Sequence, residues 1–327
     1  MTEGVFEYHG MGAGASLNTE GLPYPLLHVE RPYAIPADTA AVFSDTACRF
    51  ACDLIQMALE EDGPDLTSLG IFPWNETASA RIVAKQRTVV IGLPLVSLVL
   101  SIVGMPADSW KAEVEEGSIV EPGTVVARFH GYTIQLLKAE RIMLNLMTHL
   151  SGVGNLTQEY LKELEGTGVR LLDTRKTLPG HRYLEKYAVR VAGGVNHRMN
   201  LTDMLMLKDN HIDAAGSMTK AVAAVRGKYA PCPPIEIECR NEAEVREAVA
   251  CQVERIMLDN MDVPMLAKVL PLSPRSIEAE ISGGVTLETI RALALASTER
   301  PADFISVGRI THSAPSADFS MKMDREA

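Results

Sequence analysis

Basic side chains gather in one stretch of an otherwise acidic chain, and several of them come directly after short apolar runs. Cations that follow buried parallel strands are typical of a pocket for an anionic ligand. Solvated loop residues are the alternative, but repetition at several strand ends favours the pocket. The members of this basic cluster are Arg175, Lys176, His181, Arg182, Arg190, His197, Arg198 and Lys208.

Carboxylates lie in or at the end of two later strands. Glu236 and Glu238 alternate within one predicted strand and therefore share a face, and Asp259 follows the next strand. Carboxylates at neighbouring strand ends can bind ribose hydroxyls or a Mg²⁺ ion carried in by a pyrophosphate. An internal ion pair with Lys208 or Arg198 is the alternative. The alternation alone does not choose between the two glutamates.

Glycine-rich turns follow the last two predicted strands. Ser282-Gly283-Gly284 comes after one strand and opens a helix, where backbone N–H groups and the helix dipole can hold a phosphate. Gly308 follows the final strand, and barrel proteins commonly bind phosphate with the loops after their last two strands. The alternative is that glycine merely permits a tight turn. Together these turns predict a phosphate site.

The elements that position these residues alternate between strand and helix from residue 169 onward. About six or seven such units without a change of pattern favour an incomplete parallel α/β barrel, in which residues past the carboxyl ends of the strands meet at one mouth. Helices are predicted at residues 241–250, with Asn241 as N-cap and Glu244 as its box partner, 264–269 and 287–296. Strands are predicted at residues 169–172, 189–192, 204–207, 235–239, 255–258, 277–281 and 304–307.

The chain before residue 151 has a different pattern. Residues 1–36 lack any sustained period and are predicted to be an extension, partly disordered. A smaller α+β domain is predicted over residues 37–150, the barrel over 151–310, and a C-terminal segment over 311–327. Within the smaller domain we expect one amphipathic helix over 38–61 and short strands at 80–86, 111–115 and 124–129. A helical pattern then covers 132–166, with a break expected at Ser151-Gly152.

Composition excludes several classes of function. The 327 residues are 46% hydrophobic but only 5% aromatic, which suits an aliphatic α/β core. A formal charge of −11 argues against general binding to nucleic acid or anionic membranes. The 5 cysteines form no CxxC pair and predict neither a disulfide framework nor a zinc site, so we expect the cytoplasm. No signal peptide is evident, and the apolar run over 88–103 is too short to span a bilayer.

A set of linked motifs between about residues 53 and 318 closely resembles quinolinate phosphoribosyltransferase, also called carboxylating nicotinate-nucleotide pyrophosphorylase. The order and spacing of the motifs agree with the family. They are Glu140-Arg141, Asp173-Thr174-Arg175-Lys176-Thr177, Glu185-Lys186-Tyr187-Ala188-Val189, Gly193-Gly194-Val195-Asn196-His197-Arg198, Leu207-Lys208-Asp209-Asn210-His211, Leu258-Asp259-Asn260, Ser282-Gly283-Gly284 and Thr311-His312-Ser313.

The resemblance implies a reaction and a set of roles. Quinolinate and 5-phosphoribosyl 1-pyrophosphate, with Mg²⁺, would give nicotinate mononucleotide, pyrophosphate and CO₂ in a homodimer, or a multiple of dimers, with shared active sites. Lys176 would face the pyrophosphate and, with Glu238 and Asp259 on the ribose and Mg²⁺ side, be catalytic. The quinolinate carboxylates would be held by Arg175, His197, Arg198, Lys208 and a neighbouring chain's Arg141. The 5′-phosphate would be held by Ser282, Gly283, Gly308 and His312.

Three positions depart from the family pattern, and three other functions compete with the one that the family implies. Asn200, Thr202 and Ile281 differ from the residues expected there, which affects the shape of the pocket. One rival is a transferase for nicotinate or another pyridine that does not decarboxylate it. A second is a Schiff-base aldolase that uses Lys208. A third is a non-catalytic anion-binding protein, against which the carboxylate pair opposite so many cations argues.

Overall fold

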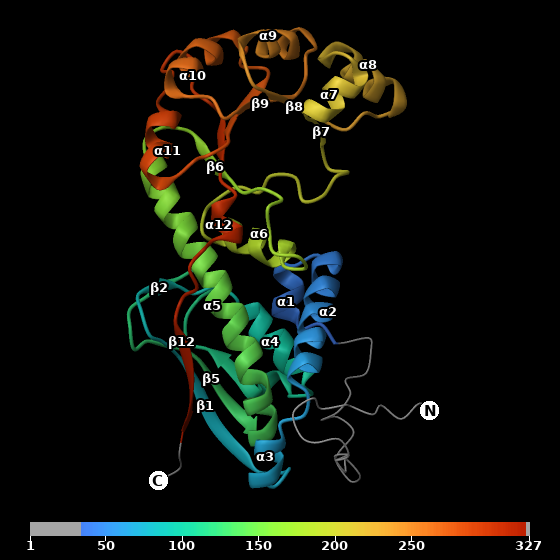
Figure 1. Cartoon of the computed structure of the whole chain (residues 1–327). Coiled ribbons are helices and arrows are strands. Elements are labelled where there is room, and N and C mark those ends of the chain that lie inside the picture. Colours follow the sequence, from blue (N-terminus) through green and yellow to red (C-terminus); the bar gives the residue numbers. More distant parts are fainter. Residues whose placement is uncertain (1–33, 325–327) are drawn as a thin grey trace, which may run out of the picture.

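The computed structural model of the chain describes residues 34–324. The extension predicted over residues 1–36 therefore lies outside the described residues, except for its last three positions. Figure 1 shows two parts arranged along the long helix α5 (Thr133–Leu164), an N-terminal part below and a parallel sheet with its helices above. No helix among residues 34–324 has the length and apolar character that crossing a bilayer requires.

The N-terminal part is a four-stranded antiparallel sheet covered by helices. The sheet has the order β12-β1-β5-β3, and its strand β12 (Phe319–Asp324) comes from the far end of the chain. The predicted strands at 80–86 and 124–129 correspond to β1 and β5, and the one at 111–115 overlaps β3. The other elements are α1 (Ala37–Val42), α2 (Asp45–Asp62), α3 (Leu66–Ile71), β1 (Thr77–Ala84), β2 (Thr88–Val89), α4 (Leu93–Ile102), η2 (Ala107–Ser109), β3 (Trp110–Ala112), β4 (Ile119–Val120) and β5 (Val125–Tyr132).

The single helix predicted over residues 38–61 is wrong. The chain is extended at Phe43, and Ser44 begins a second helix by accepting a hydrogen bond from the Ala47 N–H with its Oγ, at 3.3 Å. A serine side chain that caps the next helix competes with continuation of the previous one. Gly63, with φ +65°, ends α2 where the sequence predicted a stop.

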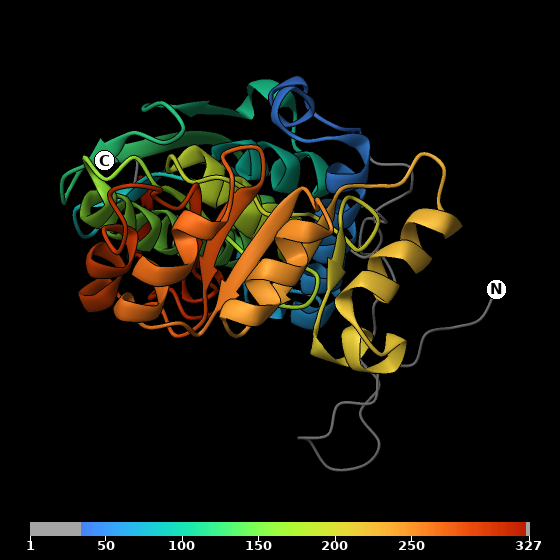
Figure 2. The same cartoon turned by 90° about the horizontal axis from the view of Figure 1, so that it is seen from above.

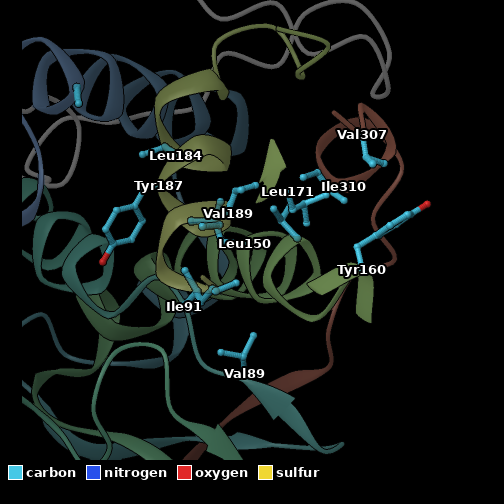
Figure 3. Packing of buried hydrophobic residues seen from close by; sticks show 14 of the residues in the cluster. Val89, Ile91, Leu150, Tyr160, Leu171, Leu184, Tyr187, Val189, Val307 and Ile310 are labelled. Carbon is cyan, nitrogen blue, oxygen red and sulfur yellow. The ribbon is translucent and has the colours of Figure 1, made fainter. Parts of the chain in front are cut away.

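The break predicted in the long helix is also wrong, because α5 runs through Ser151 and Gly152 without interruption. Ser151 Oγ accepts a hydrogen bond from the Ile91 N–H at 3.0 Å, and a Cβ on Gly152 would overlap Pro315 O. The small residues let other segments approach the helix closely, so tertiary packing overrides helix propensity. Figure 3 shows Leu150 of α5 packing with Ile91 and Val189 in the core that joins the two parts.

The second part is an incomplete parallel α/β barrel, as predicted. Its six strands have the order β6-β11-β10-β9-β8-β7, and Val195 adds a parallel bridge to Leu172 beyond β6. Seen from above, helices lie on the outer side of these strands (Figure 2). The strands are β6 (Arg170–Leu172), β7 (Leu205–Leu207), β8 (Ile235–Cys239), β9 (Arg255–Asp259), β10 (Glu278–Ser282) and β11 (Phe304–Ser306). The helices are α6 (Arg182–Val191), α7 (Asp209–Ala215), α8 (Met218–Lys228), α9 (Glu242–Ala250), α10 (Val263–Val269), η3 (Leu270–Leu272), α11 (Leu287–Ala294) and α12 (Arg309–His312).

One of the predicted barrel strands does not exist. Residues 189–192 form the last turn of α6 and its C-cap, and Gly193, with φ +104°, follows. Leu184 and Ala188 are buried and repeat at helical spacing. The apolar run that suggested a strand is therefore the end of the buried face of α6 together with its last turn. Six strand positions and the three helices were predicted correctly. Asn241 caps α9 as expected, but the Glu244 carboxylate accepts the Arg240 N–H instead of closing a capping box.

Candidate active site

The carboxyl ends of the six strands bring most of the predicted site residues to one edge of the barrel. Arg175 and Lys176 follow β6, Lys208 follows β7, and Glu238 lies near the end of β8. Asp259 ends β9 directly beside Ser282, which ends β10 in register with it. Neighbouring parallel strands point the same way, so these side chains meet at one mouth. Arg190 does not join them, because it lies on α6 with Nη2 3.4 Å from Val42 O.

A cavity of about 210 Å³ lies at the ends of β10 and β11. Every residue predicted to hold the 5′-phosphate lines it, together with Lys176. A Cβ on Gly308 would lie 3.0 Å from Lys176 Cδ and 3.3 Å from His312 Nε2, so a glycine lets the chain pass close to both side chains. The lining residues are Thr174, Lys176, Ser282, Gly283, Gly284, Val285, Thr286, Ser306, Val307, Gly308, Arg309 and His312.

The glycine pair has a specific conformation at the edge of this cavity. Gly283 has φ +91°, and a Cβ there would overlap the side chain of Asn260. Asn260 itself has φ +54° and donates its N–H to Ser282 O at 2.8 Å. The turn therefore requires glycine both for its backbone and for the approach of the neighbouring loop. The helix that follows, α11, has Thr286 as its N-cap, and Thr286 also lines the cavity.

The predicted carboxylates lie beside the cavity and close to two lysines. Lys208 Nζ donates to Glu238 Oε2 at 2.7 Å, which is the ion pair that the sequence left open as an alternative. Burial first, and then the charge of Glu238, raise the pKa of Asp259, while Lys208 and Lys176 act in the opposite direction. The side chain of Lys208 is 47% exposed, so a ligand can reach this group.

The two predicted arginines lie on the other side of the mouth. Burial first, and then the charge of Arg175, lower the pKa of the Arg198 guanidinium, which shows that these cations are neighbours. Arg198 Nη1 donates to Met204 O at 2.8 Å. Arg175 Nε is buried and has no hydrogen-bond partner within residues 34–324. A buried guanidinium nitrogen without a partner is expected to gain one from a ligand.

His197 lies beneath Arg198 and faces the barrel interior. The backbone nitrogen of Arg198 lies 2.7 Å from its Nδ1, and its Nε2 lies 3.0 Å from Glu236 and 3.3 Å from Glu280. Burial lowers the pKa of His197, but the two carboxylates outweigh it and raise the pKa to about 9. The imidazole is 4% exposed, so it does not line the open cavity.

The His197, Glu236 and Glu280 atoms lie within 4.8 Å of one another, which is the spacing of a metal site. However, the raised pKa of His197 makes the ring a cation, and its Nε2 proton faces the carboxylates. Arg255 Nη1 also lies 3.5 Å from Glu280. Two cations therefore balance two carboxylates, and the group is an internal charge network. The contacts of Nε2 are close ion pairs without the alignment of good hydrogen bonds.

Arg141 is a further predicted site residue that the fold places elsewhere. It lies on α5 and lines neither the cavity at the ends of β10 and β11 nor a larger cavity between α2 and α5. Asn145, one turn later on α5, lines that larger cavity of about 310 Å³, together with His149 and His181. Arg141 thus lies on α5, whereas Arg175 and Arg198 lie in loops of the barrel part.

Sequence reasoning missed several residues of the site. Thr174, Thr286 and Arg309 line the cavity at the ends of β10 and β11, which we call the phosphate-type cavity. Their positions directly beside Arg175, after the glycine pair and after Gly308 were signals that could have identified them. Glu280 was not predicted either, because nothing local distinguishes it from a glutamate on the outer face of a strand.

An incomplete barrel with a phosphate-type cavity, a carboxylate pair and two arginines at its mouth defines an enzyme class that handles sugar phosphates and other anions. The comparisons with known proteins give the particular family. The chain belongs to the quinolinate phosphoribosyl transferase family, whose N-terminal domain matches residues 65–151 and whose C-terminal domain matches residues 153–322.

Relatives and solved structures agree with this assignment. The chain is 39% identical over 264 residues to a probable carboxylating nicotinate-nucleotide pyrophosphorylase from Bacillus subtilis, covering 80% of this chain and 89% of the relative. A protein of the same name from Synechocystis is 42% identical over 249 residues, covering 75% and 83%. The crystal structure of NadC from Streptococcus pyogenes is similar with a TM-score of 0.77 and 36% identity, covering 84% and 98%.

Proposed function

We propose that this chain transfers the phosphoribosyl group of 5-phosphoribosyl 1-pyrophosphate to quinolinate with decarboxylation, giving nicotinate mononucleotide, pyrophosphate and CO₂ in NAD synthesis. The observation that carries the proposal is the arrangement of three sites around one mouth of the barrel. A phosphate-type cavity lies at one side, Arg175 and Arg198 lie at the other, and Glu238 and Asp259 complete the mouth. The relatives named for this reaction support it.

The charges suit the reaction at the ribose. Departure of pyrophosphate leaves positive charge at the ribosyl carbon, and a fixed carboxylate such as Glu238 can stabilise it while the pyridine nitrogen attacks. Lys176 lines the phosphate-type cavity and also acts on Asp259, so one ammonium group can serve the leaving pyrophosphate. In this proposal Lys176, Glu238 and Asp259 are the catalytic residues, and position and charge supply most of the catalysis.

The arginines suit the pyridine dicarboxylate. Arg175 and Arg198 lie together, and a guanidinium can bind a carboxylate with two parallel hydrogen bonds. Once the ring nitrogen is quaternary, it can accept the electrons released when the adjacent carboxylate leaves as CO₂. The cations then hold the remaining carboxylate. Lys208 is proposed to leave Glu238 and join them when substrate binds.

Mg²⁺ is proposed to bind with the pyrophosphate, and Glu238 and Asp259 fit it as oxygen ligands. Burial first, and then the charge of Glu238, raise the pKa of Asp259, so a cation between the two carboxylates would stabilise its charged form. Bound Mg²⁺ would neutralise charge on the pyrophosphate. We also propose a homodimer, or a multiple of dimers, in which Arg141 serves the neighbouring chain. A reducing cytoplasmic location is proposed as well, which suits cysteines that form no disulfide among residues 34–324.

The test is an assay with quinolinate labelled with ¹⁴C in the carboxyl group next to the ring nitrogen. We expect equal amounts of ¹⁴CO₂ and nicotinate mononucleotide, and only when 5-phosphoribosyl 1-pyrophosphate and Mg²⁺ are both present. Nicotinate replaces quinolinate in a parallel reaction. Product from nicotinate without CO₂ release from quinolinate would replace the proposed function with that of a non-decarboxylating transferase.

A further inference from the structure

Lys186 is a charged side chain in the centre of the protein. Among residues 34–324 it is the largest of the fully buried side chains, and it forms an ion pair with Asp173, which is also fully buried. Burial lowers the pKa of Lys186 and raises the pKa of Asp173, each opposed by the charge of the other. Burying both charges is expensive, and apolar residues of similar volume often replace such a pair without loss of stability. The pair therefore calls for a role beyond stability.

The ion pair connects three segments of the barrel. Asp173 follows β6, Lys186 lies on α6, and both bind the loop that precedes Arg198. Lys186 Nζ donates to His197 O at 2.9 Å, and Asp173 Oδ1 accepts the His197 N–H at 2.8 Å. Asn196 Nδ2 donates to Asp173 Oδ2 at 2.7 Å and to Lys186 O at 2.8 Å. The loop backbone is thus held on both sides by charged groups.

These contacts hold the backbone next to the two predicted arginines. Asp173 lies two residues before Arg175, and His197 directly precedes Arg198. We propose that the Asp173–Lys186 ion pair is a positioning device that fixes the backbone of both arginines at the spacing required by a pyridine dicarboxylate. The proposal rests on the proposed function, and the two residues act through the arginines without touching the substrate.

The phosphate side of the mouth has its own attachments. Thr311 Oγ1 donates to Lys176 O at 2.8 Å, so α12 holds the segment at Lys176 independently of the ion pair. The glycine turn is held by Asn260. Loss of the ion pair should therefore disturb the binding of quinolinate far more than the binding of the sugar pyrophosphate. A purely structural role would not separate the two substrates in this way.

The test uses the double variant Asp173→Asn, Lys186→Met in the full chain. Removing both charges avoids the unpaired buried charge that either single change would leave. We expect a folded protein whose KM for quinolinate rises roughly ten- to hundredfold, as small misplacements of binding groups do, with a much smaller change in KM for 5-phosphoribosyl 1-pyrophosphate. A folded double variant with both KM values at the wild-type level would overturn the inference.

A matched control is the double variant Arg300→Met, Asp303→Asn. Arg300 is buried and pairs with Asp303 at 2.8 Å before β11, at the opposite end of the barrel. We expect this variant to lose stability but keep both KM values. An equal rise in KM for quinolinate in the control would reduce the Asp173–Lys186 pair to a structural role. A wild-type chain without turnover would overturn the proposed function and this inference together, whereas an active wild type with an unaffected double variant overturns the inference alone.

Discussion

The two sides of the barrel mouth are built to hold anions by different means. The phosphate side consists mainly of short turns, with Gly283 and Gly308 at the ends of neighbouring strands. The arginine side consists of long side chains whose backbone is held by the buried Asp173–Lys186 pair. A turn carries its own conformation, whereas a long side chain needs a supporting network. The arginine side should therefore be the more sensitive to changes at a distance.

The largest effect is expected where the arginine side is proposed to be completed by a neighbouring chain. Arg141→Ala and Arg175→Ala should each be nearly inactive alone. Refolding equal amounts together should give roughly half heterodimers, each with one intact site of two, and so restore roughly a quarter of wild-type activity. The measurement is turnover of the mixture. An inactive mixture, with heterodimers verified by differently tagged chains, would exclude a shared site.

Within one chain, Arg198→Ala should remove most of the affinity for quinolinate. Truncating one partner of a buried charge pair with a carboxylate costs about 2–5 kcal/mol, and the sugar pyrophosphate should bind nearly as before. Calorimetry with each substrate measures the two affinities separately. Arg190→Ala is the matched control, because Arg190 is an exposed arginine on α6 and should bind quinolinate as wild type does. Unchanged affinity for quinolinate in Arg198→Ala would mean that Arg198 does not bind quinolinate.

Between the two sides, Glu238→Gln should lower turnover more than it lowers affinity. The amide keeps the shape of the carboxylate but loses the charge that opposes developing positive charge at the ribose. We expect a fall in kcat of about a hundredfold, with smaller changes in either KM. Steady-state kinetics at saturating substrates decide the point. A variant with normal kcat would leave Glu238 as no more than the partner of Lys208.

The sequence predicted the features that depend on local patterns and missed those that depend on tertiary contacts. The barrel strands, the glycine turns and the Glu238–Asp259 neighbourhood follow from local patterns, and the structure has them where expected. The false strand at 189–192 and the false break at Ser151-Gly152 arose because local patterns do not reveal which segment packs on a helix. Glu280 pairs with His197, which is far away in sequence, and Lys186 contacts Asp173 and His197 across two loops of the fold. Their roles became visible only when the fold brought those partners together.

On the phosphate side, Gly283→Ala should harm the turn directly. The backbone at φ +91° disfavours alanine by roughly 1–3 kcal/mol, and the added methyl group would also overlap Asn260. We expect lower stability in urea unfolding and weaker binding of the sugar pyrophosphate. Gly166→Ala is the control, because its φ is +76° and nothing lies within 4 Å of the added carbon. If both variants lose the same stability and binding, the overlap with Asn260 has no effect.

The smallest effect concerns the charge network beneath Arg198. The pKa of His197 is raised from 6.5 to about 9, since Glu236 and Glu280 outweigh its burial. A raised pKa in the folded state contributes stability that is complete below pH 6.5 and is lost as the pH rises through 9. The slope cannot exceed about 1.4 kcal/mol per pH unit, and the lowered pKa of Lys186 opposes it.

We therefore expect the free energy of unfolding to fall by about 1 kcal/mol between roughly pH 7 and 8.5 in the wild type. His197→Gln should be less stable throughout, because Glu236 and Glu280 lose a cation, but it should lack this part of the slope. His130→Gln, at an exposed histidine in β5, should keep it. Arg255 and Arg198 are the other charges facing the network, and neither is expected to change its charge in this range. Equal slopes in His197→Gln and wild type would mean that His197 is not the group that titrates, and that the arginine side rests on a network whose charge is fixed.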